Sequence, residues 1–536
     1  MYADLANGAE AQESVRFARA RSVVMGGQLM RGGRRVQLFL VMAVLVACAA
    51  AGLFAEPAVA DTPPPAVPSG QWDWPTYGRS SQHTFAAPTT LDQVSARTLA
   101  PAWFFPTGDA VTANPVVVGS TVYVGSWDGH FYALDRATGK LRWNFQIAPQ
   151  PAVVPRPGEF PRDPSSDGGL ITSSAWFQPG AGSRPDLVIF GGGYTLYALR
   201  AADGTEYWHH DYTGLPEAPA DPAHDEARIF SSPVVVGNRV LFGVTSDGQS
   251  GHRGYFVAAN LATGDPLWRF ETSVDDTGAV LNDGCGGVWS SPTIDAARGL
   301  AVFDVADCDF QARGPYNERV IALRIGNGKP AWVFTPPRIT QGDPSCDWDF
   351  GATPNLGTAP DGSAVLGVGG KDGTYYRIDP DTGHLVWMKN VVFGGVAGGF
   401  IATTAFDGQR VYGATALGDI GVCEPGNPAD LPVQEPSLHS FDATSGSVPW
   451  QQVHAASFAP TTVAGGMVFN AHATDPLIQV RDAATGLLIT SLPLPASSDS
   501  GVAVSRNALF FGTGSPEQGT PVGVYAYTPL GVTPTP

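Results

Sequence analysis

The stretch NPVVVGSTVYVGSWDGHFYALDRATGKLRW, residues 114–143, contains three alternating apolar runs separated by the turn pairs Gly119-Ser120 and Asp128-Gly129. A further turn at Gly139 precedes a fourth run that contains Trp143. Apolar alternation with a period of two, interrupted by Gly-containing pairs, is typical of short antiparallel strands joined by tight turns. We therefore predict that this stretch forms one four-stranded sheet.

The end of this stretch recurs along the chain with variations. Every copy has a Gly in the same place, and in the first six copies a Trp stands four residues after it, whereas Thr490 replaces the Trp in the seventh. Successive glycines are separated by 40 residues (446 to 486) to 65 residues (139 to 204), the length of a four-stranded sheet with variable loops. The copies are YALDRATGKLRW (132–143), YALRAADGTEYW (197–208), VAANLATGDPLW (257–268), IALRIGNGKPAW (321–332), YRIDPDTGHLVW (376–387), SFDATSGSVPW (440–450) and VRDAATGLLIT (480–490).

These repeats predict an all-β fold, an eight-bladed β-propeller of four-stranded antiparallel blades over residues 101–530. The Gly adopts a turn conformation that other residues avoid, and the Trp can dock against the neighbouring sheet and tie blade to blade. The last unit lacks its own outer strand, and AWFFPTG (102–108) can supply it, so that N- and C-terminal strands close the ring. Eight strand openings are recognised, near Pro115, Ser173, Pro233, Pro292, Pro354, Thr403, Pro460 and Val502.

Composition and charge narrow the class of protein. The chain has 536 residues with 65 Gly and 46 Pro, so that every fifth residue, on average, interrupts regular helix. A helical bundle or coiled coil is therefore excluded. The formal net charge of −18 argues against nucleic acid as a partner.

The N-terminal 60 residues are typical of an export signal. Three arginines, Arg31, Arg34 and Arg35, precede the apolar run of residues 36–55, and the small-residue site Ala58-Val59-Ala60 follows. We expect cleavage after Ala60, with two alternatives: lipidation of Cys48 within LVAC (45–48), or retention of the run as a membrane anchor. Each places the globular part outside the cytoplasm, as a secreted, periplasmic or cell-surface protein that contacts the membrane only through this segment.

The remaining chain is divided into a Pro-rich linker and lead-in segment (61–100), the propeller (101–530) and a short tail (531–536). The exported part keeps an even number of cysteines, which favours disulfides in an oxidising compartment. Three pairings remain open. The cysteines concerned are Cys285, Cys308, Cys346 and Cys423.

The repeated AxDxxTGxxxW pattern resembles that of the pyrroloquinoline-quinone (PQQ) propeller family, which includes methanol, ethanol and polyvinyl-alcohol dehydrogenases. The lead-in stretch WPTYGRSSQHT…LAPAWFFPTG (74–108) is similar to the opening of those enzymes. The polyvinyl-alcohol and quinoprotein alcohol dehydrogenases are those that the chain resembles most. Non-catalytic relatives share the repeats, so the repeats alone imply the fold and not the chemistry.

Asp349 is the candidate catalytic base. It lies in CDWDFGATPNL (346–356), which resembles the family segment DxWD[YF]A, whose second Asp accepts the substrate hydroxyl proton. Lanthanide-using relatives place another Asp two residues on, where this chain has Gly351, so the resemblance implies calcium as the metal. The alternative is an Asp that caps backbone groups at a strand start.

Two further residues match positions that contact the quinone in the family. Lys371 in GGKDGTYY (369–376) fills the place of a cation, and Trp289 in GCGGVWSSPTID (284–295) fills the place of the aromatic floor beneath the planar cofactor. Only four lysines occur in the chain. The alternatives are an ordinary hairpin lysine and a core tryptophan.

The family's metal ligands are replaced in this chain. In SDGQSGHRG (246–254), Gln249 stands where the family has Glu, with Asp247 close by, and Ser246 is a candidate cofactor contact. In DVAD (304–307), Asp307 stands where the family has Asn. A carboxylate and an amide are thus exchanged between the two sides of the metal site, which conserves one negative charge.

The resemblance implies a secreted or cell-surface quinoprotein dehydrogenase that oxidises an alcohol, with polymeric and secondary alcohols among the candidates, by means of PQQ and calcium. Because the chain has no CxxCH haem-attachment motif, a separate electron acceptor is expected. The alternative is a non-catalytic propeller of the same family that binds proteins as a scaffold.

Overall fold

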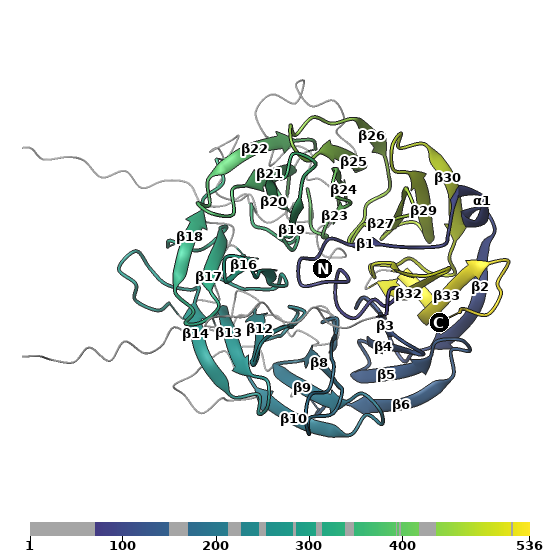
Figure 1. The fold of residues 1–536 in the computed structure, drawn as a ribbon, viewed down its shortest axis with the longest axis horizontal. Helices are drawn as coiled ribbons and strands as arrows, with labels where there is room; N and C mark the ends of the chain where they lie inside the picture. Colours follow the sequence, from purple (N-terminus) through teal and green to yellow (C-terminus); the bar gives the residue numbers. More distant parts are fainter. Residues whose placement is uncertain are drawn as a thin grey trace, which may run out of the picture. The chain divides into compact units, whose positions relative to one another are not determined.

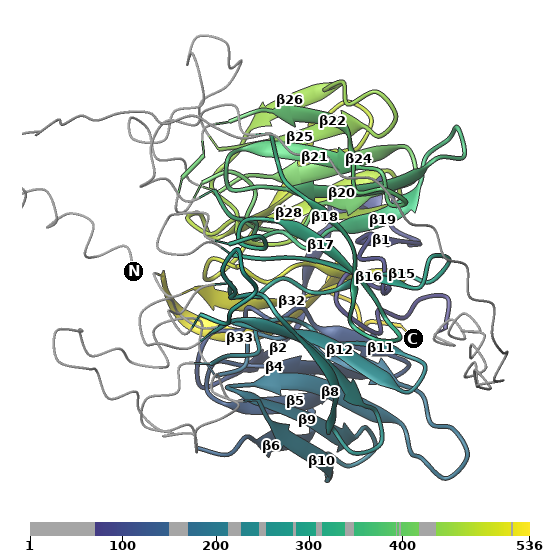
Figure 2. The same cartoon turned by 90° about the vertical axis from the view of Figure 1, so that its left-hand side faces the viewer.

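Eight antiparallel sheets stand side by side around a centre, and each predicted repeat contributes strands to one of them (Figure 1). The computed structural model describes residues 70–149, 170–212, 227–245, 253–281, 286–306, 314–337, 348–392, 394–395, 398–416, 436–515 and 518–535. The predicted eight-bladed propeller is confirmed. Figure 2 shows the ring from the side, with β22 and β26 on one side and β6 and β10 on the opposite side.

The blades are numbered in chain order, and their strands run from the centre outwards. They are blade 1, β3 (Val116–Val118), β4 (Thr121–Gly125), β5 (His130–Asp135), β6 (Leu141–Gln146); blade 2, β7 (Trp176–Gln178), β8 (Leu187–Gly192), β9 (Thr195–Arg200), β10 (Glu206–Asp211); blade 3, β11 (Val234–Val236), β12 (Arg239–Val244), β13 (Tyr255–Asn260), β14 (Pro266–Glu271); blade 4, β15 (Thr293–Asp295), β16 (Leu300–Asp304), β17 (Val320–Arg324), β18 (Pro330–Phe334); blade 5, β19 (Asn355–Thr358), β20 (Ala364–Gly369), β21 (Thr374–Ile378), β22 (Leu385–Asn390); blade 6, β23 (Ala405–Phe406), β24 (Arg410–Ala414), β25 (Ser437–Asp442), β26 (Trp450–Val453); blade 7, β27 (Thr462–Ala464), β28 (Met467–Ala471), β29 (Leu477–Asp482), β30 (Leu488–Pro493); and blade 8, β31 (Ala503–Ser505), β32 (Ala508–Ser515), β33 (Gln518–Pro529).

The N-terminal part of the described chain completes blades 7 and 8. Strand β2 (Leu99–Pro106) pairs antiparallel with β33 and becomes the outer strand of blade 8, as predicted for residues 102–108. Strand β1 (Ala86–Ala87) pairs parallel with β27 and adds a fifth strand to blade 7. The short helix α1 (Gln93–Ala96) lies between these two strands in the chain and contacts β30. No helix among the described residues has the length and apolarity needed to cross a bilayer.

Docked tryptophans tie the outer rim of the ring together. Each motif Gly has φ between 68° and 80°, and a Cβ at that position would lie only 2.4–2.8 Å from a Trp ring atom of the preceding blade. Each of these Trp Nε1 groups donates to a backbone carbonyl near that Gly at 2.9–3.2 Å. The Trp–Gly pairs are Trp103–Gly139, Trp143–Gly204, Trp208–Gly264, Trp268–Gly328, Trp332–Gly383, Trp387–Gly446 and Trp450–Gly486.

Trp103 of β2 makes this contact between blades 8 and 1, although it stands outside the repeated motif. The interface between blades 7 and 8 lacks the contact because Thr490 takes the place of the Trp. There the segment before β2 is bonded to blade 7 instead: Arg97 donates to the Ile489 carbonyl at 2.5 Å, and Gln93 donates to Asp482 at 2.6 Å. The interface between blades 7 and 8 is thus stabilised by the lead-in segment rather than by a docked Trp ring.

A second ring of contacts surrounds the centre. The residue two positions before an innermost strand donates its backbone N–H to the side chain of the equivalent residue in the next blade. Six such bonds, of 2.8–3.2 Å, join blade 8 to blade 1 and each following blade as far as blade 6. The acceptors are Asn114, Ser174, Ser232, Ser291, Thr353 and Thr403.

The lead-in segment crosses the centre of the ring (Figure 1). Residues 74–85 exchange backbone hydrogen bonds of 2.7–3.0 Å with the innermost strands of blades 1, 2, 4, 5, 6 and 7. Buried rings fill the space between blades, as in the stacked pair Phe256–Phe303 with centroids 4.1 Å apart. The lead-in segment therefore joins the innermost strands of six blades across the centre. Its Pro-rich composition did not predict this role.

Candidate functional site

Three of the predicted site residues meet where blades 4 and 5 adjoin. Trp289 precedes β15, Asp349 precedes β19, and Lys371 lies in the turn between β20 and β21. The Lys371 Nζ lies 2.8 Å from Asp349 Oδ1 and 5.3 Å from the centroid of the Trp289 ring. Both charged residues are buried, with 2% of Asp349 and 8% of Lys371 exposed. The cluster therefore combines a cation with a carboxylate on one side and an aromatic ring on the other.

The backbone holds Lys371 beside Asp349. The Lys371 N–H donates to the Asp349 carbonyl at 3.0 Å, and Asp372 stabilises the turn by accepting the Thr374 N–H at 2.9 Å and the Tyr376 hydroxyl. A Cβ on Gly399 would lie 2.5 Å from the Lys371 carbonyl oxygen, so the segment after blade 5 can pack against this turn only because it carries glycine there. The glycines of GGVAGG (394–399) were the available sequence signal for this packing.

Asp304, at the end of β16, is a neighbouring carboxylate that the sequence pattern did not single out. Its side chain is fully buried, and neither carboxylate oxygen has a hydrogen-bond partner among the described residues. Burial raises the pKa of Asp304 well above its usual range, the Ser290 hydroxyl offsets part of this effect, and the nearby negative charge of Asp349 raises the pKa further. Its N–H donates to the Ser290 hydroxyl at 3.3 Å, which places it beside the residue that follows Trp289. The sequence pattern in this strand had pointed to Asp307 instead.

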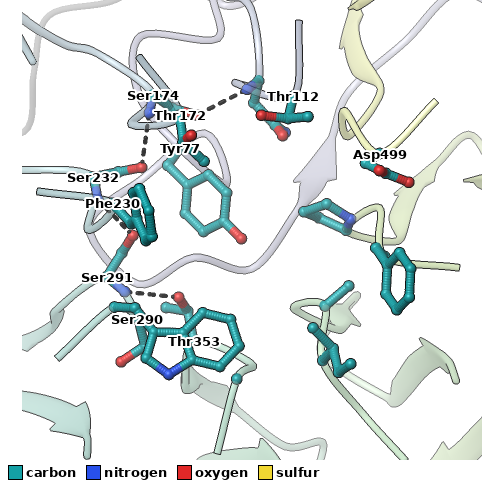
Figure 3. Close-up of a pocket in the computed structure, with 17 residues that line it drawn as sticks. Tyr77, Thr112, Thr172, Ser174, Phe230, Ser232, Ser290, Ser291, Thr353 and Asp499 are labelled. Atoms are coloured by element: carbon teal, nitrogen blue, oxygen red, sulfur yellow. Dashed lines mark hydrogen bonds between the residues drawn. The ribbon is translucent and has the colours of Figure 1, made fainter. Parts of the chain in front are cut away.

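A cavity of about 300 Å³ occupies the centre of the ring next to this cluster (Figure 3). Residues that precede the innermost strands of all eight blades line it, and most of its polar groups are hydroxyls such as Ser174, Ser232 and Thr353. Tyr77 of the lead-in segment points into it, and its hydroxyl is hydrogen-bonded to Thr403 Oγ1 at 2.8 Å. Burial raises the pKa of Tyr77 to about 12. Trp289 also lines the cavity and so adjoins both the cavity and the charged cluster.

Several predicted residues lie outside the described part of the chain. They are the candidate cofactor contact Ser246, the candidate metal ligands Asp247, Gln249 and Asp307, and the cysteines Cys285, Cys308, Cys346 and Cys423. The export segment, residues 1–60, lies outside it as well. Within the described ranges, no three His, Cys, Asp or Glu side chains are grouped so that they could hold a metal ion.

Comparison with protein families assigns the fold to a known group. The family described as the β-propeller domain of glucose, ethanol and alcohol dehydrogenases, of the PQQ type, matches residues 74–397, more than half of the chain. The chain belongs to this family. This quinoprotein alcohol dehydrogenase-like propeller also matches, over residues 371–517, the family of the outer membrane protein assembly factor BamB.

Similar proteins of known sequence carry names of dehydrogenases. A polyvinylalcohol dehydrogenase of a Pseudomonas species is 26% identical over 68% of this propeller chain and 59% of its own length. The dehydrogenase subunit of a quinone alcohol dehydrogenase from Komagataeibacter europaeus is 26% identical over 74% of the chain and 55% of its own length. The propeller chain thus spans about three fifths of the length of such relatives.

Solved structures of this fold superpose over most of the chain. The quinohemoprotein alcohol dehydrogenase from Comamonas testosteroni covers 87% of the chain, with 82% of its own chain covered, a TM-score of 0.67 and 19% identity. A europium-containing methanol dehydrogenase covers 86%, with 98% of its own chain covered, a TM-score of 0.66 and 17% identity. At these identities the superpositions establish the fold and not the activity.

Proposed function

We propose that the chain is a PQQ-dependent dehydrogenase that oxidises an alcohol and uses calcium with the quinone. The observation that carries this proposal is the buried Asp349–Lys371 pair beside Trp289, at the centre of a propeller of the PQQ family. Structural turns that repeat in every blade do not require a buried ion pair, whereas a bound cofactor and a hydroxyl substrate do require charge and an aromatic surface.

The cluster fits a planar, anionic quinone. Trp289 supplies a flat ring that such a cofactor can stack on, and the Lys371 ammonium lies beside that ring, where it can bind quinone oxygens. Ser246, the candidate cofactor contact, lies outside the described residues, and its role stays a prediction. PQQ, when bound, supplies the acceptor for a hydride from the carbinol carbon.

The cluster also fits a hard divalent cation. Two carboxylates, Asp304 and Asp349, lie near one another, while Lys371 is the single cation paired with Asp349 in the described part of the chain. Calcium accepts carboxylate and amide oxygens alike, so Asp349 and the predicted ligands Gln249, Asp307 and Asp247 are of the chemistry it prefers.

In the proposed reaction, an Asp349 carboxylate oxygen accepts the proton of the substrate hydroxyl. Lys371 holds that carboxylate in place through the 2.8 Å contact, so the base does not have to reorient when the substrate arrives. The burial of Asp349 keeps bulk water away from the proton-accepting oxygen. Trp289 fixes one face of the binding site.

The substrate class that we propose is a secondary or polymeric alcohol, because two relatives are named polyvinylalcohol dehydrogenases. Electrons would then leave to a separate acceptor, since the sequence contains no CxxCH motif. We also propose that the protein is exported, with the mature chain beginning at Asp61. N-terminal sequencing of the mature protein checks this start, and a lipid on Cys48 or an uncleaved run would contradict it.

Reconstitution tests the activity directly. The purified chain is incubated with PQQ and Ca²⁺, bound quinone is followed by absorbance, and reduction of an artificial dye is measured with primary, secondary and polymeric alcohols. We expect quinone binding and alcohol-dependent dye reduction. If neither binding nor thermal stabilisation appears at high PQQ and Ca²⁺ concentrations, the second candidate function remains, a protein-binding scaffold, which the match of residues 371–517 to the BamB family favours.

A further inference from the structure

Asp304 differs from those buried charged residues that hydrogen bonds hold in place. Buried Arg377, for example, donates to four acceptors, two of them backbone carbonyls of the next blade. Asp304 has no exposed surface and no hydrogen bond to either carboxylate oxygen among the described residues. Burying an ionised carboxylate without a partner is strongly unfavourable, so the fold alone does not account for such a group.

The position of Asp304 is set by regular structure. It ends β16, where it is paired with Val320 of β17, and its N–H is bonded to the hydroxyl of Ser290. The carboxylate therefore stands on a strand next to the segment that carries Trp289. Its charge also acts on Asp349, from the neighbouring blade, and on Tyr77, which points into the central cavity.

The charges of this cluster do not balance within the described residues. When both carboxylates are ionised, Asp304 and Asp349 contribute two negative charges, and Lys371 contributes one positive charge that is paired with Asp349. No ion pair to Asp304 is formed in the described ranges. Burial favours protonation of Asp304, which removes its charge, whereas a bound cation would allow the carboxylate to stay ionised. A cation satisfies both oxygens at once.

We propose that Asp304 is a ligand of a hard divalent cation of the calcium class, which it binds together with Asp349 beside Trp289. This assigns the main anionic ligand to a residue on β16 rather than to Asp307. The remaining coordination positions of such a cation are available to cofactor oxygens, carbonyls or water, which calcium accepts. The proposal rests on the proposed function for the choice of calcium, but binding of the cation alone does not depend on turnover.

The experiment measures Ca²⁺ binding without any substrate. Calorimetry and thermal unfolding are carried out on the full chain, first with Ca²⁺ alone and then with Ca²⁺ and PQQ, for the wild type, Asp304→Asn and Asp295→Asn. Asp295 is the matched control, because it is a buried carboxylate at the other end of the same β15–β16 hairpin and is already paired with Arg298 at 2.8 Å. We expect Asp304→Asn to weaken Ca²⁺ binding by about tenfold or more, since ligand charge sets calcium affinity. Asp295→Asn should leave Ca²⁺ binding unchanged.

The unfolding temperature in the absence of metal is a second readout, in which the variant is expected to equal or exceed the wild type. In a chelator, Asp304→Asn should be at least as stable as the wild type, because it removes a buried charge that has no partner. A purely structural aspartate would give the reverse result. If Asp304→Asn is less stable than the wild type in chelator, or binds Ca²⁺ as the wild type does, the proposal is wrong.

The wild type also tests the proposal by itself. Absence of any Ca²⁺-dependent change, with or without PQQ, would overturn it. Ca²⁺ binding that depends on Asp304, but without PQQ binding or dye reduction, would retain the cation site and overturn only the proposed dehydrogenase function. Should Asp304→Asn fail to fold, Asp304→Ser serves as the second variant, and unchanged Ca²⁺ affinity in that variant would again contradict the proposal.

Discussion

The outer rim of the propeller and its centre near blades 4 and 5 use tryptophan in different ways. At the rim, one contact is repeated seven times: a Trp ring covers a Gly of the next blade, and its Nε1 group donates to a carbonyl. Near the centre, Trp289 stands outside that register and lies beside a buried lysine that is paired with the carboxylate of Asp349. The docked Trp rings at the rim have their Nε1 groups hydrogen-bonded, whereas neither carboxylate oxygen of Asp304 has a hydrogen-bond partner among the described residues.

This difference separates residues that hold the fold from residues that we assign to function. A contact that repeats in every blade is explained by the need to join blades, so it carries no information on chemistry. A buried carboxylate beside the central cavity whose oxygens have no hydrogen-bond partner among the described residues requires another explanation. The following experiments test whether the two regions can be separated by mutation.

The largest effect is expected at the centre. Asp349→Asn removes the proposed base and should lower the turnover number for alcohol-dependent dye reduction by about 10²–10⁴-fold, while PQQ affinity stays close to that of the wild type. The measurement is steady-state dye reduction together with quinone titration. Asp361→Asn, in an exposed turn of blade 5, is the control and should keep full activity. Full activity of Asp349→Asn would contradict the proposed mechanism.

The next effect compares one tryptophan from each region. Trp208→Ala at the rim removes a buried ring and its bond to the Leu261 carbonyl, and should lower the free energy of unfolding by about 3–5 kcal/mol. Trp289→Ala should mainly weaken PQQ binding. Denaturant unfolding and quinone titration of both variants measure the two quantities. If Trp208→Ala weakens PQQ binding at unchanged stability, the separation of rim and centre fails.

Blade 7, where the rim contact to blade 8 is missing, should lower the stability of the protein at acidic pH. The His472 ring lies 4.0 Å from that of His454, and burial lowers the pKa of His472 from 6.5 to about 4. Nearby Asp475 opposes this shift, and Arg481 reinforces it.

Because the folded state disfavours protonated His472, its contribution to stability is complete above pH 6.5 and is lost as the pH falls to about 4. The expected loss is about 3 kcal/mol. Denaturant unfolding between pH 7 and pH 4 should show a smaller decrease for His472→Gln than for the wild type. Equal slopes for both proteins would contradict the prediction.

The smallest effect is expected from a single methyl group at the rim. Gly328→Ala places a Cβ 2.5 Å from the Trp268 ring at a φ of 68°, and should cost about 1–3 kcal/mol of unfolding free energy. Gly299→Ala is the matched control in the same blade, because Gly299 has a similar φ of 65° and nothing lies within 4 Å of its Cβ. A stability difference between these two variants, measured by urea unfolding, supports the rim contact; equal stabilities would show that the ring can move aside.

The sequence by itself was sufficient for the architecture and for part of the site. The eight blades, the role of each motif Gly and Trp, and the closing strand from the N-terminal side were all predicted and are confirmed. These features could be predicted because the alternation of apolar and polar residues, the turn residues and their spacing are local properties of the chain. Asp349, Lys371 and Trp289 were predicted from local motifs, and the structure brings these three together. Their roles stay predictions.

Only the tertiary structure decided which residues lack partners and which distant segments join the ring. Trp103 docks on Gly139, and the lead-in segment crosses the centre, because of contacts between blades that no local pattern records. Asp304 has an ordinary place at the end of a strand, and nothing in DVAD (304–307) distinguishes it from an exposed strand-end aspartate. Its exceptional state depends on burial and on the charge of Asp349, which stands 45 residues later in the chain and becomes its neighbour only when the blades close around one centre.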